Sequence, residues 1–180
     1  MTDISTLPSE KPIILIGMMG AGKTTVGRFL AKALAREFID LDHAIVERCG
    51  VNIPTIFDIE GEEGFRKREH STLQAVIQQP NLVLATGGGA ILAQPNRQLL
   101  DQHGIVIYLK VDISELWRRV SRDKNRPLLQ TAQPRKALKK LMDQRSHLYE
   151  SAAHYTIESK THSAHHVVEQ IKQQLAQETV

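Results

Sequence analysis

The residues best suited to chemistry form one short run near the start of the chain. Residues 17–24, Gly-Met-Met-Gly-Ala-Gly-Lys-Thr, match the pattern G-x-x-x-x-G-K-S/T and lie between an apolar run and a helical pattern. Glycines in such a loop let backbone N–H groups converge on phosphate oxygens, and the next helix adds the positive end of its dipole. We expect Lys23 to reach the β and γ phosphates of a nucleotide and the Thr24 hydroxyl to bind Mg²⁺. A glycine turn without a nucleotide is the alternative interpretation.

Two carboxylates follow at the end of the next apolar piece. Asp40-Leu41-Asp42 places both on the same side of an extended chain. One could hold Mg²⁺ through water, while the other accepts a proton or a hydrogen bond from an attacking hydroxyl. Asp42 could instead be the N-cap of a helix over residues 43–48, and the two roles are compatible.

Further along the chain, an arginine and a glycine triplet offer groups for an acidic acceptor. Arg66 follows Phe57 and Phe65, which we interpret as core residues. A lone arginine is usually a surface ion-pair partner, but the fork of a guanidinium also suits a carboxylate. The glycines at 87–89 end another apolar run, where the missing Cβ atoms would let a flat ring approach the backbone. A bare turn is the alternative there.

These segments together resemble those of the shikimate kinases. The resemblance extends over about residues 12–175, and the segments follow one another in the order and at the spacing of that family. Each segment beyond the phosphate loop is weakly specific, whereas their combination is specific. The segments are the phosphate loop, Asp40-x-Asp42, Gly61-Glu62-x-x-Phe65-Arg66, Thr86-Gly87-Gly88-Gly89, Arg126-Pro127-Leu128-Leu129 and Arg145-x-x-x-Tyr149.

The resemblance implies ATP-dependent phosphorylation of the 3-hydroxyl of shikimate, a step of aromatic amino acid biosynthesis, with Mg²⁺ as the cofactor. It gives the shikimate hydroxyls and the role of base to Asp42, and water-mediated support of Mg²⁺ to Asp40. Arg126 would lie on a lid near the transferred phosphoryl group, and Arg119 would stack on adenine. The expected shikimate-binding residues are Asp42, Arg66, Gly88, Gly89 and Arg145. The expected ATP-binding residues are Gly20, Ala21, Gly22, Lys23, Thr24, Thr25, Arg119 and Arg126, and the catalytic ones are Lys23, Asp42 and Arg126.

Other functions remain open at this level. Within the kinases, the acceptor could be another small hydroxy acid such as gluconate, or a nucleoside monophosphate. The chain could also be a nucleotide-dependent switch without an acceptor, although a switch gains little from converging Asp42, Arg66 and Arg145. The loop at residues 158–163, which supplies the other side of the adenine pocket in the family, has no match.

The elements that position these residues alternate between strands and helices. Continuous apolar runs bounded by turn residues predict strands buried on both faces. We therefore expect the P-loop kinase fold with a mobile lid, a three-layer α/β sandwich around a central, mainly parallel five-stranded sheet. Residues 1–11 are expected to be a flexible lead-in and residues 12–178 a single domain, with an acceptor-binding segment at about 41–70 and the lid at about 122–134. The predicted strands are 13–16, 38–39, 82–85, 105–109 and 155–157. The predicted helices are 24–35, 43–48, 61–78, 95–102, 113–121, 134–149 and 163–177.

Composition excludes several classes of protein. The 180 residues suffice for one domain and are too few for two ordinary ones. With 41% hydrophobic and 24% charged residues, the chain is neither disordered nor fibrous. Cys49 is the single cysteine, so an internal disulfide is impossible. No apolar run is long enough for a membrane span and the start of the chain lacks a signal layout, so we expect a cytoplasmic protein. The expected partners are ATP and shikimate, with no nucleic acid and no membrane, and the expected state is a monomer.

Charge is distributed unevenly, although the net charge is only +3. Residues 118–145 hold ten Lys or Arg against two Asp, whereas residues 37–69 hold nine acids against four bases. One segment facing a polyanion and another facing metal or hydroxyls would explain the asymmetry, and solvated helix faces are the simpler alternative. Nucleic acid is a weaker alternative, because no aromatic residues interleave with the basic stretch.

Overall fold

Five short strands form the centre of the fold, which a computed structural model describes for residues 10–123, 127–159 and 163–177. Their order in the sheet is β2-β3-β1-β4-β5, and all neighbouring pairs are parallel. The register places Ile13 beside Val83 on one side and Ile105 on the other, so β1 is the central strand. The strands are β1 (Ile13–Ile16), β2 (Glu37–Asp40), β3 (Leu82–Ala85), β4 (Ile105–Lys110) and β5 (Tyr155–Glu158).

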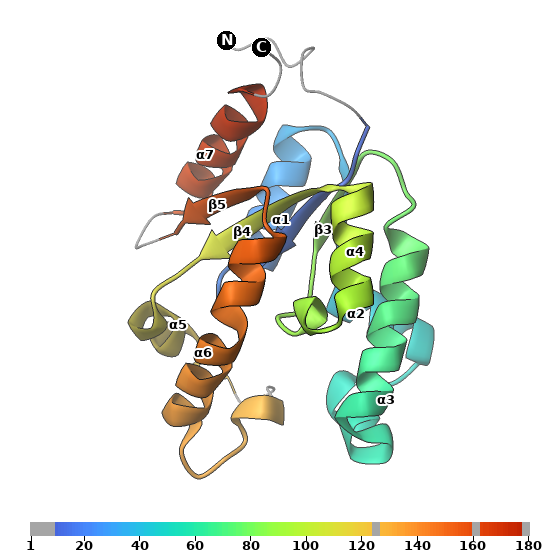
Figure 1. The fold of residues 1–180 in the computed structure, drawn as a ribbon, viewed down its shortest axis with the longest axis vertical. Coiled ribbons are helices and arrows are strands. Elements are labelled where there is room, and N and C mark those ends of the chain that lie inside the picture. Colours follow the sequence, from blue (N-terminus) through green and yellow to red (C-terminus); the bar gives the residue numbers. More distant parts are fainter. Residues whose placement is uncertain (1–9, 124–126, 160–162, 178–180) are drawn as a thin grey trace.

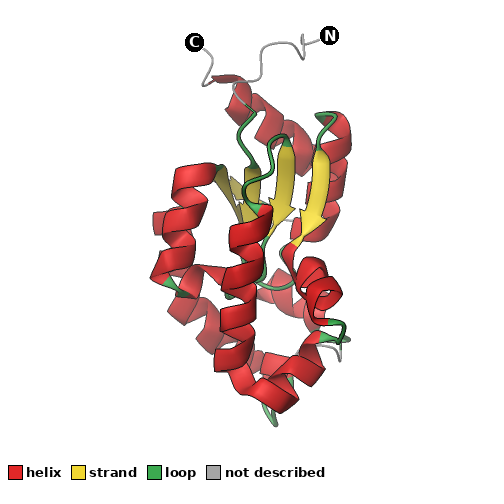
Figure 2. Cartoon of the chain, turned by 90° about the vertical axis from the view of Figure 1, so that its right-hand side faces the viewer, coloured by secondary structure: helices red, strands yellow, loops and turns green. Residues whose placement is uncertain are grey.

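Helices cover both faces of this sheet (Figures 1 and 2). One face carries α1 (Lys23–Ala33) and α7 (Ala164–Gln177), and the other carries α3 (Ile53–Val76), α4 (Gln94–His103) and α6 (Pro134–Ala152). The prediction of a three-layer α/β sandwich with a parallel five-stranded sheet is confirmed. Right-handed crossovers place the connecting helices of such a sheet on both of its faces. The remaining short elements are α2 (Leu41–Cys49), α5 (Ile113–Val120), η2 (Ala90–Leu92) and η3 (Pro127–Leu129).

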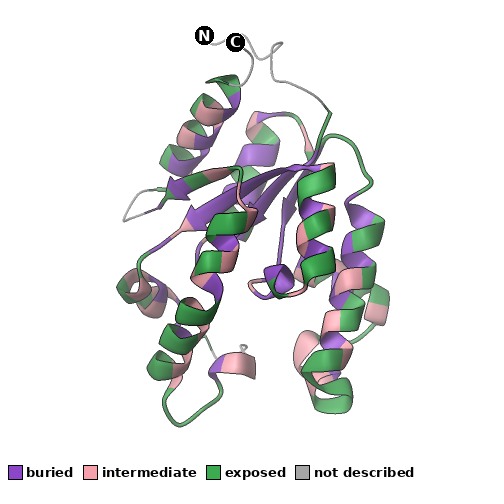
Figure 3. Cartoon of the chain, in the orientation of Figure 1, coloured by how far each residue is buried: buried purple, intermediate pink, exposed green. Residues whose placement is uncertain are grey.

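The inner strands supply the core because both faces of the sheet are covered. All residues of β1 and β3 are buried, with relative exposures of 1% or less (Figure 3). The edge strands β2 and β5 contain exposed residues, among them Glu37 and Glu158. Inner strands therefore consist of continuous apolar runs, whereas edge strands mix apolar and polar residues.

Helix α3 differs most from the prediction, which began at residue 61. The helix starts at Ile53, because the side chain of Asn52 caps it and accepts a 2.9 Å hydrogen bond from the Thr55 backbone N–H. Pro54 suits the first turn, where no N–H is needed. The chain then changes direction at Gly61, whose φ of 68° and ψ of −175° only glycine adopts readily. Residues 53–60 and 62–76 are therefore two helical segments joined by a break.

The predicted lid, at about 122–134, is described in part. Residues 127–129 form η3, where Leu129 is buried, and α6 begins at Pro134. Residues 124–126, and with them Arg126, lie outside the described residues, as do residues 1–9 of the predicted lead-in. The motion of the lid stays a prediction.

The basic stretch lies mostly at the surface. Arg118 pairs with Glu115 and Lys139 pairs with Asp143, both with well-exposed basic side chains. These pairs agree with the interpretation of solvated helix faces. Among the described residues, no helix has the length and apolar character needed to cross a membrane.

Candidate active site

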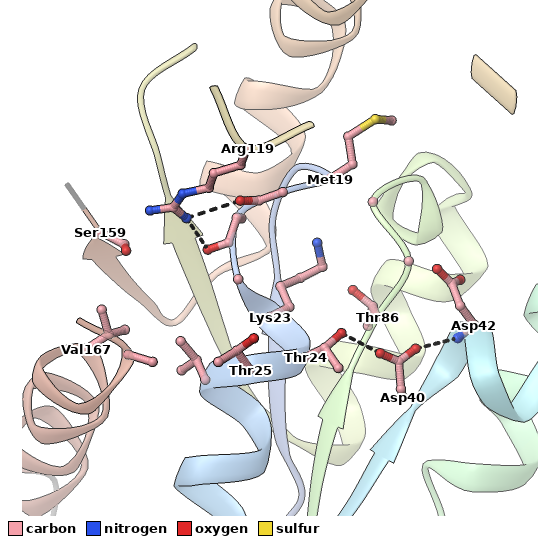
Figure 4. Close-up of a pocket in the computed structure, with 17 residues that line it drawn as sticks. Met19, Lys23, Thr24, Thr25, Asp40, Asp42, Thr86, Arg119, Ser159 and Val167 are labelled. Atoms are coloured by element: carbon pink, nitrogen blue, oxygen red, sulfur yellow. Dashed lines mark hydrogen bonds between the residues drawn. The ribbon is translucent and has the colours of Figure 1, made fainter. Parts of the chain in front are cut away.

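A cleft of about 500 Å³ lies where the carboxyl ends of β1, β2 and β3 meet, the usual ligand position of such sheets (Figure 4). The loop after β1, the end of β2 at Asp40 and the segment after β3 at Thr86 all open onto it. The cleft also receives Asp42 and Gly88. Of the predicted ATP-binding residues, it is lined by Gly20, Ala21, Gly22, Lys23, Thr24, Thr25 and Arg119.

Lys23 is the first residue of α1 and directs its ammonium group toward the phosphate loop. Nζ donates hydrogen bonds of 2.8 Å to the carbonyl groups of Gly17 and Met18, and the residue is only 9% exposed. In Figure 4 the side chain points into the cleft. A buried cation at the positive end of a helix dipole gives this part of the cleft a preference for anions.

Thr24 and Asp40 connect the start of α1 with the end of β2. Thr24 Oγ1 donates a 2.5 Å hydrogen bond to Asp40 Oδ2. Asp40 Oδ1 accepts hydrogen bonds from the backbone N–H groups of Asp42 at 3.0 Å and His43 at 3.4 Å. Asp40 is therefore the N-cap of α2, and the alternative that gave this role to Asp42 is wrong. The two aspartates do not lie on one extended strand either, because α2 already begins at Leu41.

The oxygen atoms of Thr24 and Asp40 form a donor set that fits Mg²⁺. Hydroxyl and carboxylate oxygens are the hard ligands that this ion prefers, and it keeps several waters when the protein supplies few of them. Both side chains line the cleft on the side of Asp42 (Figure 4). Their role as metal ligands stays a prediction.

Asp42 lies in the first turn of α2, and its carboxylate approaches the glycine triplet. A Cβ atom placed on Gly87 would lie 2.8 Å from Asp42 Oδ1 and 2.9 Å from Glu69 Oε1. Asp42 lines both the large cleft and a neighbouring cavity of about 130 Å³. Met19, Gly87 and Gly88 are likewise shared by the two cavities. Asp42 therefore marks their junction, where its carboxylate can accept a hydrogen bond from a hydroxyl in the smaller cavity.

The smaller cavity combines apolar walls with cationic groups. Phe57 and Phe65 come from the two halves of α3, and their ring centroids are 4.8 Å apart. Phe65 is buried as predicted and Phe57 is half-buried, and both line the cavity. Apolar contributions also come from Ile53, Pro127 and Leu128, and guanidinium groups come from Arg66 and Arg145.

Arg66 is oriented by two carboxylates of its own helix. Nη1 donates to Glu69 Oε2 at 2.8 Å, and Nη2 donates to Glu62 Oε1 at 3.0 Å. Glu69 is fully buried, and burial raises the pKa of its carboxyl group, while the charge of Arg66 acts in the opposite direction. The second oxygen, Oε1, has no hydrogen-bond partner within the described part of the chain.

Arg145 reaches the same cavity from α6. It is 2% exposed, and its Nε has no hydrogen-bond partner among the residues that the structure describes. Burying a guanidinium without full pairing is costly, and a carboxylate in the cavity would supply a partner. Arg135, Lys136 and Lys140 of the same helix are exposed, so Arg145 is separate from the solvated basic surface.

The glycine triplet is packed tightly by side chains, which gives a reason for glycine that a bare turn lacks. A Cβ atom on Gly89 would overlap the guanidinium of Arg66, and Gly87 is approached by Asp42 and Glu69. The carbonyl of Gly88 accepts a hydrogen bond from the Tyr149 hydroxyl. Burial raises the pKa of Tyr149, so this hydroxyl remains a donor at neutral pH.

The far end of the large cleft is formed by α5 and the segment after β5. Arg119 Nη1 donates to the carbonyls of Gly20 at 3.1 Å and Ala21 at 3.4 Å, and Nε donates to Glu115 at 2.7 Å. Hydrogen bonds from Arg118 and Arg119 lower the pKa of Glu115 to about 2. The unmatched loop at 158–163 contributes Ser159, and α7 contributes Ala164 and Val167. Residues 160–162 of that loop lie outside the described part.

Among the residues that line the two cavities, several were not predicted from the sequence, and Glu69, Gly87 and Ser159 illustrate why. Glu69 follows Arg66 by three positions in a predicted helix, a spacing at which two side chains meet, so this signal was present. Gly87 belonged to the recognised triplet, but its contact with Asp42 depends on how α2 packs. Ser159 carried no signal in the sequence.

Comparisons with known proteins identify the family of the chain. The shikimate kinase family, represented by a sequence model, matches residues 19–176. Shikimate kinase of Bordetella avium is 58% identical over 156 residues, which cover 87% of this chain and 75% of the relative. The enzyme of Nitrosospira multiformis is 53% identical over 163 residues, which cover 91% of this chain and 84% of the relative.

Solved structures lead to the same family. Shikimate kinase from Acinetobacter baumannii in complex with shikimate has a TM-score of 0.94 and 46% identity, and the match covers 98% of both chains. A gluconokinase from Sinorhizobium meliloti has a TM-score of 0.61 at 14% identity over 94% of both chains, a likeness of fold alone. The chain belongs to the shikimate kinase family, whose members are ATP-dependent kinases.

Proposed function

We propose that this chain transfers the γ-phosphoryl group of ATP to the 3-hydroxyl of shikimate, giving shikimate 3-phosphate and ADP. The observation that carries the proposal is the position of Asp42, at the junction of an anion-binding cleft and a cavity with two arginines. A hydroxy acid that extends its carboxylate toward Arg66 and Arg145 presents a hydroxyl to Asp42. The shikimate kinase relatives and the shikimate complex of the Acinetobacter baumannii enzyme also support it.

The large cleft would hold the nucleotide. The loop residues Gly20, Ala21 and Gly22 and the ammonium of Lys23 would surround the phosphates, although the Ala21 N–H itself donates to the Met18 carbonyl. Thr24 and Thr25 lie at the start of the same helix. Lys23 would exchange its carbonyl contacts for phosphate oxygens. Thr24 would hold Mg²⁺ directly and Asp40 through water, and the ion would neutralise phosphate charge. Arg119 would contact the adenine ring.

The smaller cavity would hold shikimate. Arg66 and Arg145 would bind its carboxylate in the forked geometry of guanidinium groups, and the backbone of Gly88 and Gly89 would lie against the ring. Asp42 would orient the attacking hydroxyl and accept its proton. Phosphoryl transfer depends mainly on positioning and charge neutralisation, which these groups supply.

Arg126 completes the proposed catalytic set. Its guanidinium would approach the transferred phosphoryl group when the segment at about 122–134 closes over both ligands. This role rests on the family resemblance, because Arg126 lies outside the described residues. Within the described part, Pro127 and Leu128 line the smaller cavity, which brings the segment next to the acceptor.

The direct test measures ADP release from Mg-ATP with shikimate, with gluconate, with AMP and without an acceptor. We expect turnover that depends on shikimate, with phosphorylation at the 3-hydroxyl verified by ³¹P and ¹³C NMR. Faster turnover with gluconate or AMP would identify a different acceptor. ATP hydrolysis that is indifferent to all acceptors would support the switch and overturn the proposal.

A further inference from the structure

The buried side chain of Asn96 joins two parts of the acceptor site that come from different elements. Asn96 lies in the first turn of α4 and is only 1% exposed. Its Nδ2 donates a 2.9 Å hydrogen bond to the carbonyl of Ala90, the first residue of η2. Its Oδ1 lies 2.5 Å from Nδ1 of His70 on α3.

The chemistry of the three groups fixes the direction of both hydrogen bonds. The Ala90 carbonyl can only accept, so the amide of Asn96 must face it with Nδ2. The Oδ1 atom of Asn96 then faces His70, and the Nδ1 atom of His70 must carry a proton and donate it. Two hydrogen bonds of fixed direction therefore run from His70 to Asn96 and from Asn96 to Ala90. Rotating the Asn96 amide by 180° would break both of them.

Each end of this chain is attached to a group of the acceptor site. His70 is one helical turn after Arg66 and adjacent to Glu69, the partner of Arg66. Ala90 follows the glycine triplet directly, and its N–H donates to the carbonyl of Gly87 at 3.1 Å. Asn96 therefore connects the helix that carries the arginine with the turn that carries the glycines.

Arg66 and the glycine triplet are packed so closely that their spacing can change little. The guanidinium of Arg66 lies so close to Gly89 that a Cβ atom there would overlap it. A small displacement of α3 relative to the turn would move the arginine and the glycine backbone apart. Misplacement of binding groups by about 1 Å can lower activity by about 10²-fold.

We infer that Asn96, acting through His70, is a positioning residue that sets the spacing between Arg66 and the glycine triplet. Naming shikimate as the bound acceptor rests on the proposed function, whereas the link between the two parts rests on the geometry alone. Neither His70 nor Ala90 lines the large cleft that contains Lys23, although Gly87 and Gly88 of the same turn line both cavities. Loss of the link should therefore weaken acceptor binding more than ATP binding, because Arg66 lines the smaller cavity and not the large cleft.

The test compares two identical substitutions on the same pair of helices. His70→Phe keeps an aromatic ring and removes the donor to Asn96. His103→Phe is the matched control, because His103 Nε2 lies 3.2 Å from Gln78 Nε2 and connects α4 with the segment just after α3, at the end away from the site. Asn96→Asp tests the other hydrogen bond of the link. It keeps an acceptor for His70 but places a carboxylate against the Ala90 carbonyl.

We expect His70→Phe and Asn96→Asp to raise the KM for shikimate by about tenfold, the scale of one buried hydrogen bond lost. The KM for ATP should change less than about twofold, and His103→Phe should change neither value. His70→Gln, which restores a donor, should recover most of the shikimate KM. Equal changes in both KM values, or no recovery with glutamine, would reduce Asn96 to a general structural role.

Backbone amide hydrogen exchange at residues 87–92 tests the link between α3 and the glycine turn without an activity assay. Exchange should become faster in His70→Phe and Asn96→Asp and stay unchanged in His103→Phe. Unchanged exchange in the first two variants would overturn the inference, whatever the substrate. An unmodified chain that shows no shikimate-dependent turnover would instead overturn the proposed function, and the exchange comparison would still decide whether α3 and the turn are linked.

Discussion

Lys23 carries the charge that the phosphate loop surrounds. Lys23→Met preserves the length of the side chain and removes the ammonium group, so we expect kcat to fall by about 10²-fold or more. The Gly17 carbonyl loses this donor, at a cost of roughly 1–3 kcal/mol, whereas the Met18 carbonyl still accepts from the Ala21 N–H. Circular dichroism should therefore show a folded protein with a lowered unfolding temperature. Near-normal kcat in a shikimate-dependent assay would remove the central role of Lys23.

Substitutions at Asp40 and Asp42 should separate the capping of α2 from catalysis. Asp42→Asn removes the proton acceptor, and we expect kcat to fall by about 10² to 10⁴ with the free energy of unfolding nearly unchanged. Asp40→Ala removes the cap of α2 and should cost about 1 kcal/mol of stability as well as activity. Steady-state kinetics and urea titration of both variants check the pair. A stability loss in Asp42→Asn with an unchanged rate would reverse the assignment.

Glu69 makes stability depend on pH, because burial raises its pKa above the ordinary value of 4.5. Between 4.5 and the raised value, the folded protein keeps a proton that the unfolded chain has lost, so this group lowers stability as pH rises. Glu69→Gln lacks this titration. The stability of the unmodified protein relative to the variant should therefore be greatest near pH 4 and decrease toward neutral pH. Urea unfolding from pH 4 to 8 measures the difference, and a difference that grows with pH would contradict the assignment.

The break in α3 is the element-level feature that shapes the acceptor cavity. A Cβ atom added at Gly61 meets no atom within 4 Å, so Gly61→Ala tests backbone strain alone. We expect a loss of about 1–3 kcal/mol in urea unfolding. The KM for shikimate should also rise, because residues 53–60 carry Ile53 and Phe57. Gly50→Asn is the control, since asparagine tolerates the φ of 71° and ψ of 6° there. Equal stability of the two variants would show that the break is not strained.

The elements were predictable where burial leaves a clear pattern. Strands β1 and β3, and β4 as far as Leu109, are continuous apolar runs because helices cover both faces of the sheet. The first half of α3 was missed, since residues 53–60 have one buried residue, Ile56, and therefore no apolar stripe. The signals that were present are the cap at Asn52 and the proline at the second position.

The candidate site was predictable where a motif fixes local geometry, and less so where packing decides. The phosphate loop needs only its own backbone and the start of α1. Either Asp40 or Asp42 could cap α2, and the choice depends on where β2 ends, a boundary that sequence patterns locate only to within a few residues. Contacts of Gly87 with Asp42 and Glu69 join three elements distant in sequence, so no local pattern encodes them.

At the scale of the whole molecule, two adjoining cavities predict two separable ligand effects on stability. A ligand at 100 times its Kd raises the free energy of unfolding by about 2.7 kcal/mol. We expect Mg-ATP and shikimate each to raise the unfolding temperature in differential scanning calorimetry. Lys23→Met should lose most of the response to Mg-ATP and retain the response to shikimate. Loss of both responses together would mean that the variant disturbs the fold and not one cavity.

The central position of β1 affects how the protein can fold during its synthesis on the ribosome. Ile13 pairs with Val83 and Ile105, so β1, which precedes the other described strands, receives its second neighbour only after β4 has been translated. Until then, the backbone hydrogen-bonding groups of β1 that face β4 lack their native partners. Pairings between such distant residues form slowly, because a long loop must close before any contact is gained. The phosphate loop precedes β2 to β5 in the chain, yet it gains its complete supporting sheet only after β4 has been made.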